Sequence, residues 1–315
     1  MTNRCLAAID IGSQTIRLLV AQIKENGCLI PLYRDRAIVR LGEGMHVCAM
    51  LQPRAIDRAV ACIEDFVNKA RARQAVHIFS VCTACVRMAC NAHEFLERVH
   101  KATKIMPRVV SGDEEARLSL RGVLSVLERS ITHVQPLLVI DIGGGSTECA
   151  YVINGKLHTA ISLPIGVITL TDKHIAHDPP TLDELRALEH DIETQLGNIG
   201  LLEQACQAHC ILAGTAGTAT TLAAMDLQMS IYDPERINGY RLSLQAVESL
   251  WALLTTLPRA RRIHLQGLEP GRETVIISGT ALVRAFMRST DTSEMIISDA
   301  GLLEGILLDY ALPQT

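Results

Sequence analysis

Aromatic residues are scarce in this chain: Trp, Tyr and Phe together make up 3% of its 315 residues. Its core must therefore be built from Leu, Ile, Val and Ala, which suits buried parallel strands covered by helices. Hydrophobic residues reach 48% and charged residues 20%, as is typical of a soluble globular protein. A chain of this length favours two domains of about 150 residues each.

The chain also lacks a strong charge of either sign and a long apolar run. Its formal net charge of −4 gives no support for a nucleic-acid partner, which usually requires a basic face. The uncharged stretch from Cys210 to Met225 has 16 residues and is rich in Gly and Thr, which makes it a poor membrane helix. We therefore expect no nucleic acid and no membrane, and a polyanionic ligand would need a local cluster of arginines and backbone amides.

The ten cysteines follow no disulfide spacing, and no secretory signal precedes them. Free thiols in a reducing cytoplasm are the simplest interpretation. Cys82-x-x-Cys85 and Cys206-x-x-x-Cys210 each supply half of a metal site, but buried structural cysteine is preferred over a zinc or redox role. The 11 histidines show no metal-binding spacing either.

An internal repeat is the most informative feature of the sequence. Asp10-Ile-Gly12 and Asp141-Ile-Gly143 lie 131 residues apart, and each ends one apolar run and precedes another. Asn26-Gly27 and Asn154-Gly155 then predict a hairpin into a third strand. Because solenoid repeats are far shorter, this spacing indicates a duplicated domain.

The remaining pattern alternates helices with short strands. An amphipathic helix is predicted over 54–73, and Thr181 with Glu184 forms a capping-box pattern. Further helices are expected at 91–103, 113–127, 218–225 and 302–310, and strands at 76–81, 109–110, 211–214, 275–278 and 296–298. Such alternation favours two α/β domains that face each other, with a ligand cleft between them.

A tight turn at Gly exposes backbone N–H groups that can bind phosphate oxygens. Asp10 and Asp141 precede these turns, and a carboxylate can hold magnesium directly or through water. A single Asp-x-Gly hairpin would favour a plain turn. The matching pair favours instead two loops that clamp a phosphate chain and its metal.

Several charged residues allow two interpretations from spacing alone. Glu114 and Glu115 at a helix start favour stabilisation of the helix dipole over catalysis. For Arg87, a phosphate contact and a surface or capping role are equally favoured. A basic rim for a polyanion is less favoured than a solvated face for the four arginines Arg259, Arg261, Arg262 and Arg272. No lysine-bearing phosphate loop of the P-loop type is present, which excludes that enzyme class.

Eight motifs in order resemble the exopolyphosphatase and guanosine pentaphosphate phosphohydrolase family, within the actin, sugar-kinase and heat-shock ATPase superfamily. They run through almost the whole chain: Ile9-Asp-Ile-Gly-Ser-Gln-Thr-Ile-Arg17, Thr83-Ala-Cys-Val-Arg87, Val110-Ser-Gly-Asp-Glu-Glu-Ala-Arg117, Asp141-Ile-Gly-Gly-Gly-Ser-Thr-Glu148, Ser162-Leu-Pro-Ile-Gly166, Gly214-Thr-Ala-Gly217, Asn238-Gly-Tyr-Arg241 and Ser298-Asp-Ala-Gly-Leu302.

The resemblance implies a fold and its boundaries. It implies two ribonuclease H-like (actin-like) α/β domains with a cleft between them. Domain I would hold residues 1–121 and take back 299–315 as its closing helix, and domain II would hold 122–298. The chain looks like the short form of the family without C-terminal helical domains, so processivity on long polyphosphate is not expected. A homodimer is expected from family habit.

The resemblance also implies roles for individual residues. Glu115 matches the catalytic base that activates the attacking water. Mg²⁺ or Mn²⁺ would be positioned by Asp10, Asp141 and Glu148. Phosphate would be bound by Gly12, Ser13, Gln14, Arg87, Gly143, Gly144, Gly145 and Ser146. The chain departs from the family at Gln14, where Asn is usual, and at Cys82 and Cys85, where small residues are usual.

The implied activity is magnesium-dependent hydrolysis of the terminal phosphoanhydride of inorganic polyphosphate, guanosine pentaphosphate or both, with release of orthophosphate. The chemistry agrees, because phosphoryl transfer needs charge neutralisation and an in-line nucleophile more than covalent help. One alternative is a non-catalytic polyphosphate or nucleotide sensor that keeps the phosphate loops. Another is a sugar-kinase-like phosphotransferase, but the chain offers no strong candidate for its catalytic Asp.

Overall fold

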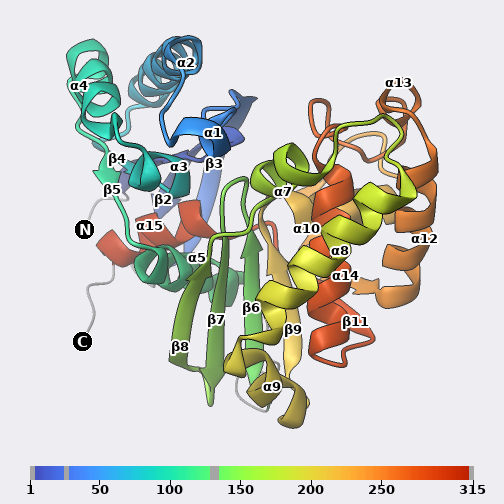
Figure 1. Ribbon diagram of the computed structural model, residues 1–315. Coiled ribbons are helices and arrows are strands. Elements are labelled where there is room, and N and C mark those ends of the chain that lie inside the picture. Colours follow the sequence, from blue (N-terminus) through green and yellow to red (C-terminus); the bar gives the residue numbers. More distant parts are fainter. Residues whose placement is uncertain (1–3, 25–27, 128–134, 312–315) are drawn as a thin grey trace. The chain divides into compact units, whose positions relative to one another are not determined.

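The computed structural model describes residues 4–24, 28–127 and 135–311. The chain divides into two compact units, shown in Figure 1. Unit 1 comprises Met1–Ser125 with Gly301–Thr315, and unit 2 comprises Val126–Ala300. Each unit holds one β-sheet covered by helices, which confirms the predicted α/β class. The expected cleft between two domains stays a prediction.

Unit 1 is built on a five-stranded sheet with the order β3-β2-β1-β4-β5. The first three strands are antiparallel neighbours, while β4 and β5 run parallel to β1. Its elements are β1 (Arg4–Ile11), β2 (Thr15–Ile23), β3 (Leu29–Ile38), α1 (Met45–Cys48), α2 (Pro53–Ala72), β4 (His77–Cys82), α3 (Ala84–Met88), α4 (Ala92–Thr103), β5 (Arg108–Val109), α5 (Gly112–Val126) and α15 (Leu302–Ala311).

Helices cover both faces of this sheet. Side chains of β1 alternate between the two faces, so each face contributes apolar side chains to a separate buried cluster. Ile9 and Ile11 join a buried cluster with Ile56 and Ile63 of α2. Leu6 and Ala8 join a separate cluster with Leu118 of α5 and Leu302, Leu303, Ile306 and Leu307 of α15. The amphipathic spacing predicted for 54–73 is thus confirmed as α2.

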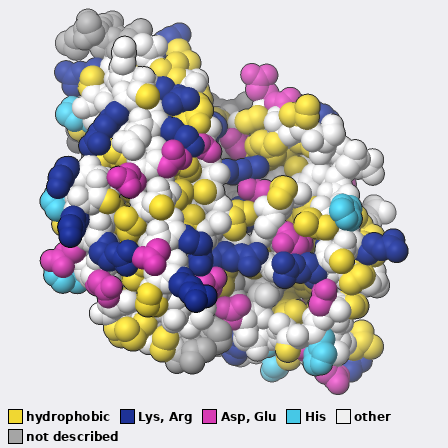
Figure 2. Space-filling model, turned by 90° about the horizontal axis from the view of Figure 1, so that it is seen from above, with side chains coloured by type: hydrophobic (Ala, Val, Ile, Leu, Met, Phe, Trp, Pro, Cys, Tyr) yellow, Lys and Arg dark blue, Asp and Glu magenta, His cyan; other side chains and the backbone are white. Residues whose placement is uncertain are grey.

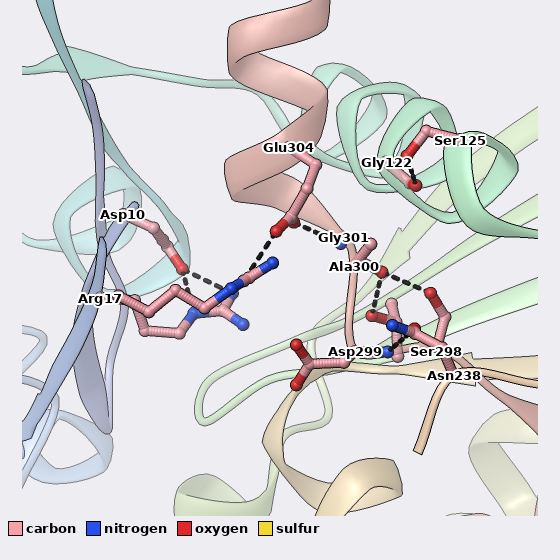
Figure 3. Close-up of polar contacts among 12 residues, drawn as sticks. Asp10, Arg17, Gly122, Ser125, Asn238, Ser298, Asp299, Ala300, Gly301 and Glu304 are labelled. Carbon is pink, nitrogen blue, oxygen red and sulfur yellow. Dashed lines mark hydrogen bonds and ion pairs between the residues drawn. The ribbon is translucent and has the colours of Figure 1, made fainter. Parts of the chain in front are cut away.

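Glycine allows α5 and α15 to touch backbone to backbone. A Cβ at Gly122 would lie 1.9 Å from the carbonyl oxygen of Gly301, and one at Gly305 would lie 1.8 Å from that of Leu118. At the start of α15, the Gly301 amide donates to Glu304 Oε2 at 2.8 Å, and Arg34 Nη1 lies 2.8 Å from Glu304 Oε1. Figure 3 shows the Glu304 carboxylate and the Gly301 amide to which it is bonded. The two helices therefore pack as one element of unit 1.

Unit 2 is built on a six-stranded sheet with the order β10-β11-β9-β6-β7-β8. Its strands and helices are β6 (Leu137–Ile142), β7 (Thr147–Ile153), β8 (Lys156–Leu163), α7 (Val167–His174), α8 (Leu182–Gly197), α9 (Gly200–Gln207), β9 (Ile211–Thr215), α10 (Ala216–Asp226), α11 (Pro234–Ile237), β10 (Arg241–Ser243), α12 (Leu244–Thr256), α13 (Arg259–Arg262), α14 (Ile276–Ser289) and β11 (Glu294–Ile297).

The strand pattern of unit 2 repeats that of unit 1. Strands β6, β7 and β8 are antiparallel neighbours, and β9 runs parallel to β6, as β4 does to β1. Asn154 and Gly155 have φ angles of 52° and 71°, which is the conformation of a tight hairpin turn. This confirms the predicted hairpin, while the matching Asn26-Gly27 lies outside the described residues.

One predicted element of unit 2 is wrong. Residues 275–278 were expected to form a strand, but Val275 is the N-cap of α14. This helix is buried on nearly all sides, and a Cβ at Gly279 would lie 2.6 Å from Thr218 Cγ2 of α10. A helix buried all round has the same unbroken apolar run as a buried strand, so the pattern could not separate them. Figure 1 shows α14 grouped with α8 and α12.

Thr181 begins α8 with the predicted capping box, since its side chain accepts from the Glu184 amide and Glu184 reaches back to the Thr181 amide. Among the described helices, none is both long enough and apolar enough to cross a membrane.

Candidate functional site

The first candidate phosphate loop, residues 12–14, joins β1 to β2. The Gly12 amide donates to the Thr15 carbonyl at 3.1 Å, and a Cβ at Gly12 would lie 3.0 Å from that oxygen. The Ser13 carbonyl accepts from the Gly42 amide at 2.9 Å. The side chains of Ser13 and Gln14 are both buried. The loop is therefore a closed turn whose carbonyl oxygens are held by the chain that follows β3.

The second loop, residues 143–146, has the same geometry between β6 and β7. The Gly143 amide donates to the Ser146 carbonyl at 2.9 Å, and a Cβ at Gly143 would lie 3.0 Å from that oxygen. The carbonyls of Gly143 and Gly144 accept from the first amides of α7 at 3.0 and 2.8 Å. In the described chain, the amides of Gly144 and Gly145 donate to no backbone carbonyl. With its carbonyls held, such a loop leaves N–H groups for an anion.

Gly166 makes this second loop possible. A Cβ at this position would lie 2.4 Å from the carbonyl carbon of Gly144 and 2.5 Å from the Gly145 nitrogen. Gly166 is the N-cap of α7, and its φ of −133° is open to any residue. The requirement for glycine here is therefore the close approach of two backbones, and not a left-handed conformation.

The charges beside the two loops differ at matching positions. Asp10 pairs with Arg17 across β1 and β2, and Asp141 pairs with Glu148 across β6 and β7. Arg17 donates to Asp10 Oδ2 from Nε at 2.9 Å and Nη2 at 2.6 Å, as Figure 3 shows. Opposite residues on antiparallel strands share a face. The first loop therefore has an ion pair beside it, and the second has two buried carboxylates.

The carboxylates of unit 2 fit a hard divalent cation. Glu148 is 1% exposed, and its Oε1 accepts from Ser146 Oγ and Ser162 Oγ, both at 2.7 Å. Magnesium prefers oxygen ligands and commonly uses one or two carboxylates with waters and substrate phosphates. Among the described residues, no three His, Cys, Asp or Glu gather as a complete metal site. In unit 1, the buried Oδ1 of Asp10 has no hydrogen-bond partner among the residues that the structure describes, and it offers a further hard oxygen.

Glu115 and Arg87 lie together in unit 1. Arg87 Nη1 from α3 lies 2.9 Å from Glu115 Oε2 and also donates to the Val110 carbonyl at 2.9 Å. Glu115 occupies the first turn of α5 and is 7% exposed. A buried carboxylate can take a proton from water, and a guanidinium has five donors, enough to hold Glu115 and a phosphate at once.

The cysteines near the first loop are thiols. Burial raises the pKa of Cys85 to about 12, although a hydrogen bond with Ser13 acts in the opposite direction. Burial also holds the pKa of Cys82 well above its ordinary value. Because zinc and redox chemistry use the thiolate, these thiols agree with the interpretation as buried structural cysteine. None of the ten cysteines forms a disulfide bond.

The arginines considered for a basic rim of unit 2 include two that are buried in internal ion pairs. Arg262 Nη2 lies 2.7 Å from Asp178 Oδ1, and Arg272 Nε lies 2.5 Å from Glu269 Oε2. A Cβ at Gly217 would lie 1.8 Å from Arg272 Nη2. These two side chains are thus part of the packing of unit 2, so the preferred interpretation of a solvated face is wrong for Arg262 and Arg272, as is a basic rim. Figure 2 shows Lys and Arg side chains interspersed with acidic ones on the face it presents.

Sequence reasoning missed three residues beside the loops: Arg17, Ser162 and Gly166. A signal for Arg17 exists, because it follows Asp10 at the interval that separates Glu148 from Asp141. Ser162 and Gly166 belong to a quoted motif, but their contacts with Glu148 and Gly144 depend on the fold of β8 and α7.

Comparison with known proteins gives consistent matches along the chain. The model of the Ppx/GppA phosphatase family matches residues 19–314. Exopolyphosphatase 2 of Mycobacterium tuberculosis is 30% identical over 324 residues, covering 97% of this chain and 98% of that protein. A bifunctional 3-dehydroquinate synthase/phosphatase of Fusobacterium nucleatum is 30% identical over 316 residues, covering 98% of this chain. The chain spans only 46% of the Fusobacterium protein's length.

Solved structures agree. A crystal structure of an exopolyphosphatase-like protein has a TM-score of 0.91 at 27% identity, covering 98% of both chains. The Ppx/GppA family member of Aquifex aeolicus has a TM-score of 0.80 at 28% identity, covering 100% of both chains.

Proposed function

Because the chain belongs to the Ppx/GppA phosphatase family, we propose that it removes the terminal phosphoryl group of inorganic polyphosphate as orthophosphate, with Mg²⁺ or Mn²⁺. The comparisons confirm three expectations from the motifs: the family, the actin-like fold class and the phosphoanhydride hydrolase type. The observation that carries the proposal is the pair of loops closed by equivalent hydrogen bonds, Gly12 to Thr15 and Gly143 to Ser146.

The two loops would bind the phosphates of the substrate through backbone amides. In the second loop the carbonyls of Gly143 and Gly144 are already bonded within unit 2, and the amides of Gly144 and Gly145 remain for phosphate oxygens. In unit 2, Asp141 and Glu148 would hold the divalent cation, which supplies charge neutralisation for the phosphate chain. The two serines bonded to Glu148 Oε1 orient its carboxylate for that role. Asp10 is proposed as a metal-positioning residue of the first loop.

Glu115 would act as the general base. A water oxygen attacks the terminal phosphorus, and its proton passes to the Glu115 carboxylate. The bridging P–O bond breaks, and the shortened chain leaves with the electron pair as a phosphate anion. Arg87 holds Glu115 in place through its ion pair of 2.9 Å and is also proposed to contact the substrate phosphates.

Guanosine pentaphosphate is proposed as a second substrate, because it ends in the same anhydride as polyphosphate. We expect short polyphosphate to be at least as good, since the proposed contacts would engage phosphates and none of them would recognise a base. A homodimer also remains a proposal, as does a cytoplasmic location, which ten cysteines without a disulfide bond suit.

The test is phosphate release at fixed magnesium from polyphosphates of defined length, guanosine pentaphosphate and ATP. We expect release from polyphosphate, with a gain in kcat/KM that levels off at short lengths. Release that keeps rising into chains of hundreds of phosphates would show a longer phosphate-binding surface than the two loops provide. Release from guanosine pentaphosphate alone would mean that base recognition decides specificity. Tight binding of all substrates without any release would establish the sensor alternative instead.

A further inference from the structure

The segment 39–43, which follows β3, is bonded directly to the first phosphate loop. The amides of Val39 and Arg40 both donate to the Gln14 carbonyl, at 3.0 and 2.9 Å, and the Gly42 amide donates to the Ser13 carbonyl. A Cβ at Gly42 would lie 3.0 Å from the Cβ of Ser13. Three backbone hydrogen bonds therefore hold the segment against the loop.

Arg58 of α2 holds the same segment from another direction. Its Nε and Nη2 donate to the Val39 carbonyl at 3.1 and 3.0 Å, and Nη2 lies 2.9 Å from Glu43 Oε1. Residue 40 is thus held in two ways. Backbone amides of its segment bond to the phosphate loop, and Arg58 bonds to Val39 before it and Glu43 after it in the chain.

Between these anchors, Arg40 has a left-handed backbone with φ of 53°. That region suits Gly or Asn, and a long side chain there is strained by its own Cβ. Such strain persists only where the surroundings over-determine it, and it concentrates at ligand-binding sites. A residue with no role for its side chain would be better replaced by Gly at this point.

The guanidinium of Arg40 makes no hydrogen bond or ion pair within the described chain, although the residue is half-buried. Nearby arginines of unit 1 differ in this respect: Arg17 is paired with Asp10, Arg58 with Glu43 and Arg87 with Glu115. Arg40 therefore offers a cation whose backbone position is fixed beside the first loop, while these three other arginines are each paired with a carboxylate.

We propose that Arg40 is a substrate-binding residue whose guanidinium contacts a phosphate group held at the first phosphate loop. The proposal rests on the function above and adds a residue that no motif singled out. Paired N–H donors of a guanidinium match the oxygens of phosphate and strengthen binding beyond what loop amides give. The strained backbone and the three anchoring amides position that contact.

A purely structural role for Arg40 predicts a different response to substitution. Arg40→Gly removes the side chain and relieves the left-handed strain, so the temperature midpoint of unfolding should stay equal or rise. If the side chain packs for stability, the same change should lower the midpoint. Arg40→Lys retains the charge but loses the paired donors.

The experiment measures tripolyphosphate binding by calorimetry, polyphosphate hydrolysis and thermal unfolding for the wild type, Arg40→Gly and Arg40→Lys. Arg54→Ala, which removes an exposed arginine in the first turn of α2, is the matched charge control. For Arg40→Gly we expect an unchanged or higher midpoint with Kd and KM raised about 10- to 100-fold, the range of a charge-assisted hydrogen bond. Arg40→Lys should recover part of this loss, and Arg54→Ala should change Kd less than about twofold.

Unchanged tripolyphosphate binding in Arg40→Gly, with hydrolysis intact in the wild type, would overturn the role of Arg40 and leave the proposed function standing. Wild-type binding that Arg40→Gly weakens, without phosphate release from any substrate, would support Arg40 and refute the hydrolase. A lower midpoint in Arg40→Gly with unchanged binding would show a structural role.

Discussion

Gly166→Ala should disable the second phosphate loop without unfolding the protein. The added Cβ would lie 2.4 Å from the Gly144 carbonyl carbon and oxygen, where ordinary contacts begin at 3.4 Å. The loop must therefore retreat by about 1 Å, because its partner in the clash is backbone and cannot rotate away. A misplacement of about 1 Å in a catalytic site can cost about 10²-fold in rate. Overpacking of this kind costs about 1–3 kcal/mol of stability.

The assay is kcat/KM for release of phosphate from short polyphosphate, beside a thermal unfolding curve. Gly197→Ala is the matched control, since a Cβ there meets nothing within 4 Å. We expect kcat/KM to fall about 10²-fold in Gly166→Ala and to stay within about twofold in Gly197→Ala. Folded Gly166→Ala protein with near-wild-type kcat/KM would mean that the geometry of residues 143–146 does not limit the reaction, and the argument from the loops would fail.

Three further predictions concern the base, the metal and acid stability. Glu115→Gln should lower kcat about 10²- to 10⁴-fold with the unfolding midpoint kept, and a near-wild-type rate would leave Glu115 structural. A strong chelator should abolish phosphate release and Mg²⁺ or Mn²⁺ restore it, while stoichiometric zinc in protein purified without added metal would revive the cysteine pairs. Burial acts to raise the pKa of Asp191, but hydrogen bonds from Lys173 and His174 outweigh it and hold this pKa at about 2. The contribution of Asp191 to stability is thus present above its ordinary pKa of about 3.9 and lost as the pH falls towards 2, so the stability deficit of Asp191→Asn should shrink over that interval.

Features that repeat or alternate in sequence were predictable. The Asp-x-Gly repeat gave both β-meanders, because the residues that end a strand and start a turn are local signals. The capping box at Thr181 and Glu184 and the hairpin at Asn154-Gly155 were predictable for the same reason. Each depends on contacts within a few residues of the chain.

Features that depend on distant packing were not predictable. The first turn of α14 reads as a strand, because burial on nearly all sides erases the helical period. The ion pair of Arg87 with Glu115 joins residues 28 positions apart through the fold of α3 and α5. The left-handed backbone of Arg40 has no sequence signal at all, since arginine rarely adopts it.

The backbone contact of Gly122 with Gly301 has a consequence for the architecture of the chain. The chain leaves unit 1 after Ser125 and re-enters it at Gly301. Because Gly122 touches Gly301, both ends of the break in unit 1 lie within about one helical turn of each other. In topological terms, unit 2 is an insertion into a parent domain at neighbouring points. Excising it and closing the gap with a short flexible linker should therefore leave a parent domain whose sheet, α5 and α15 can still assemble.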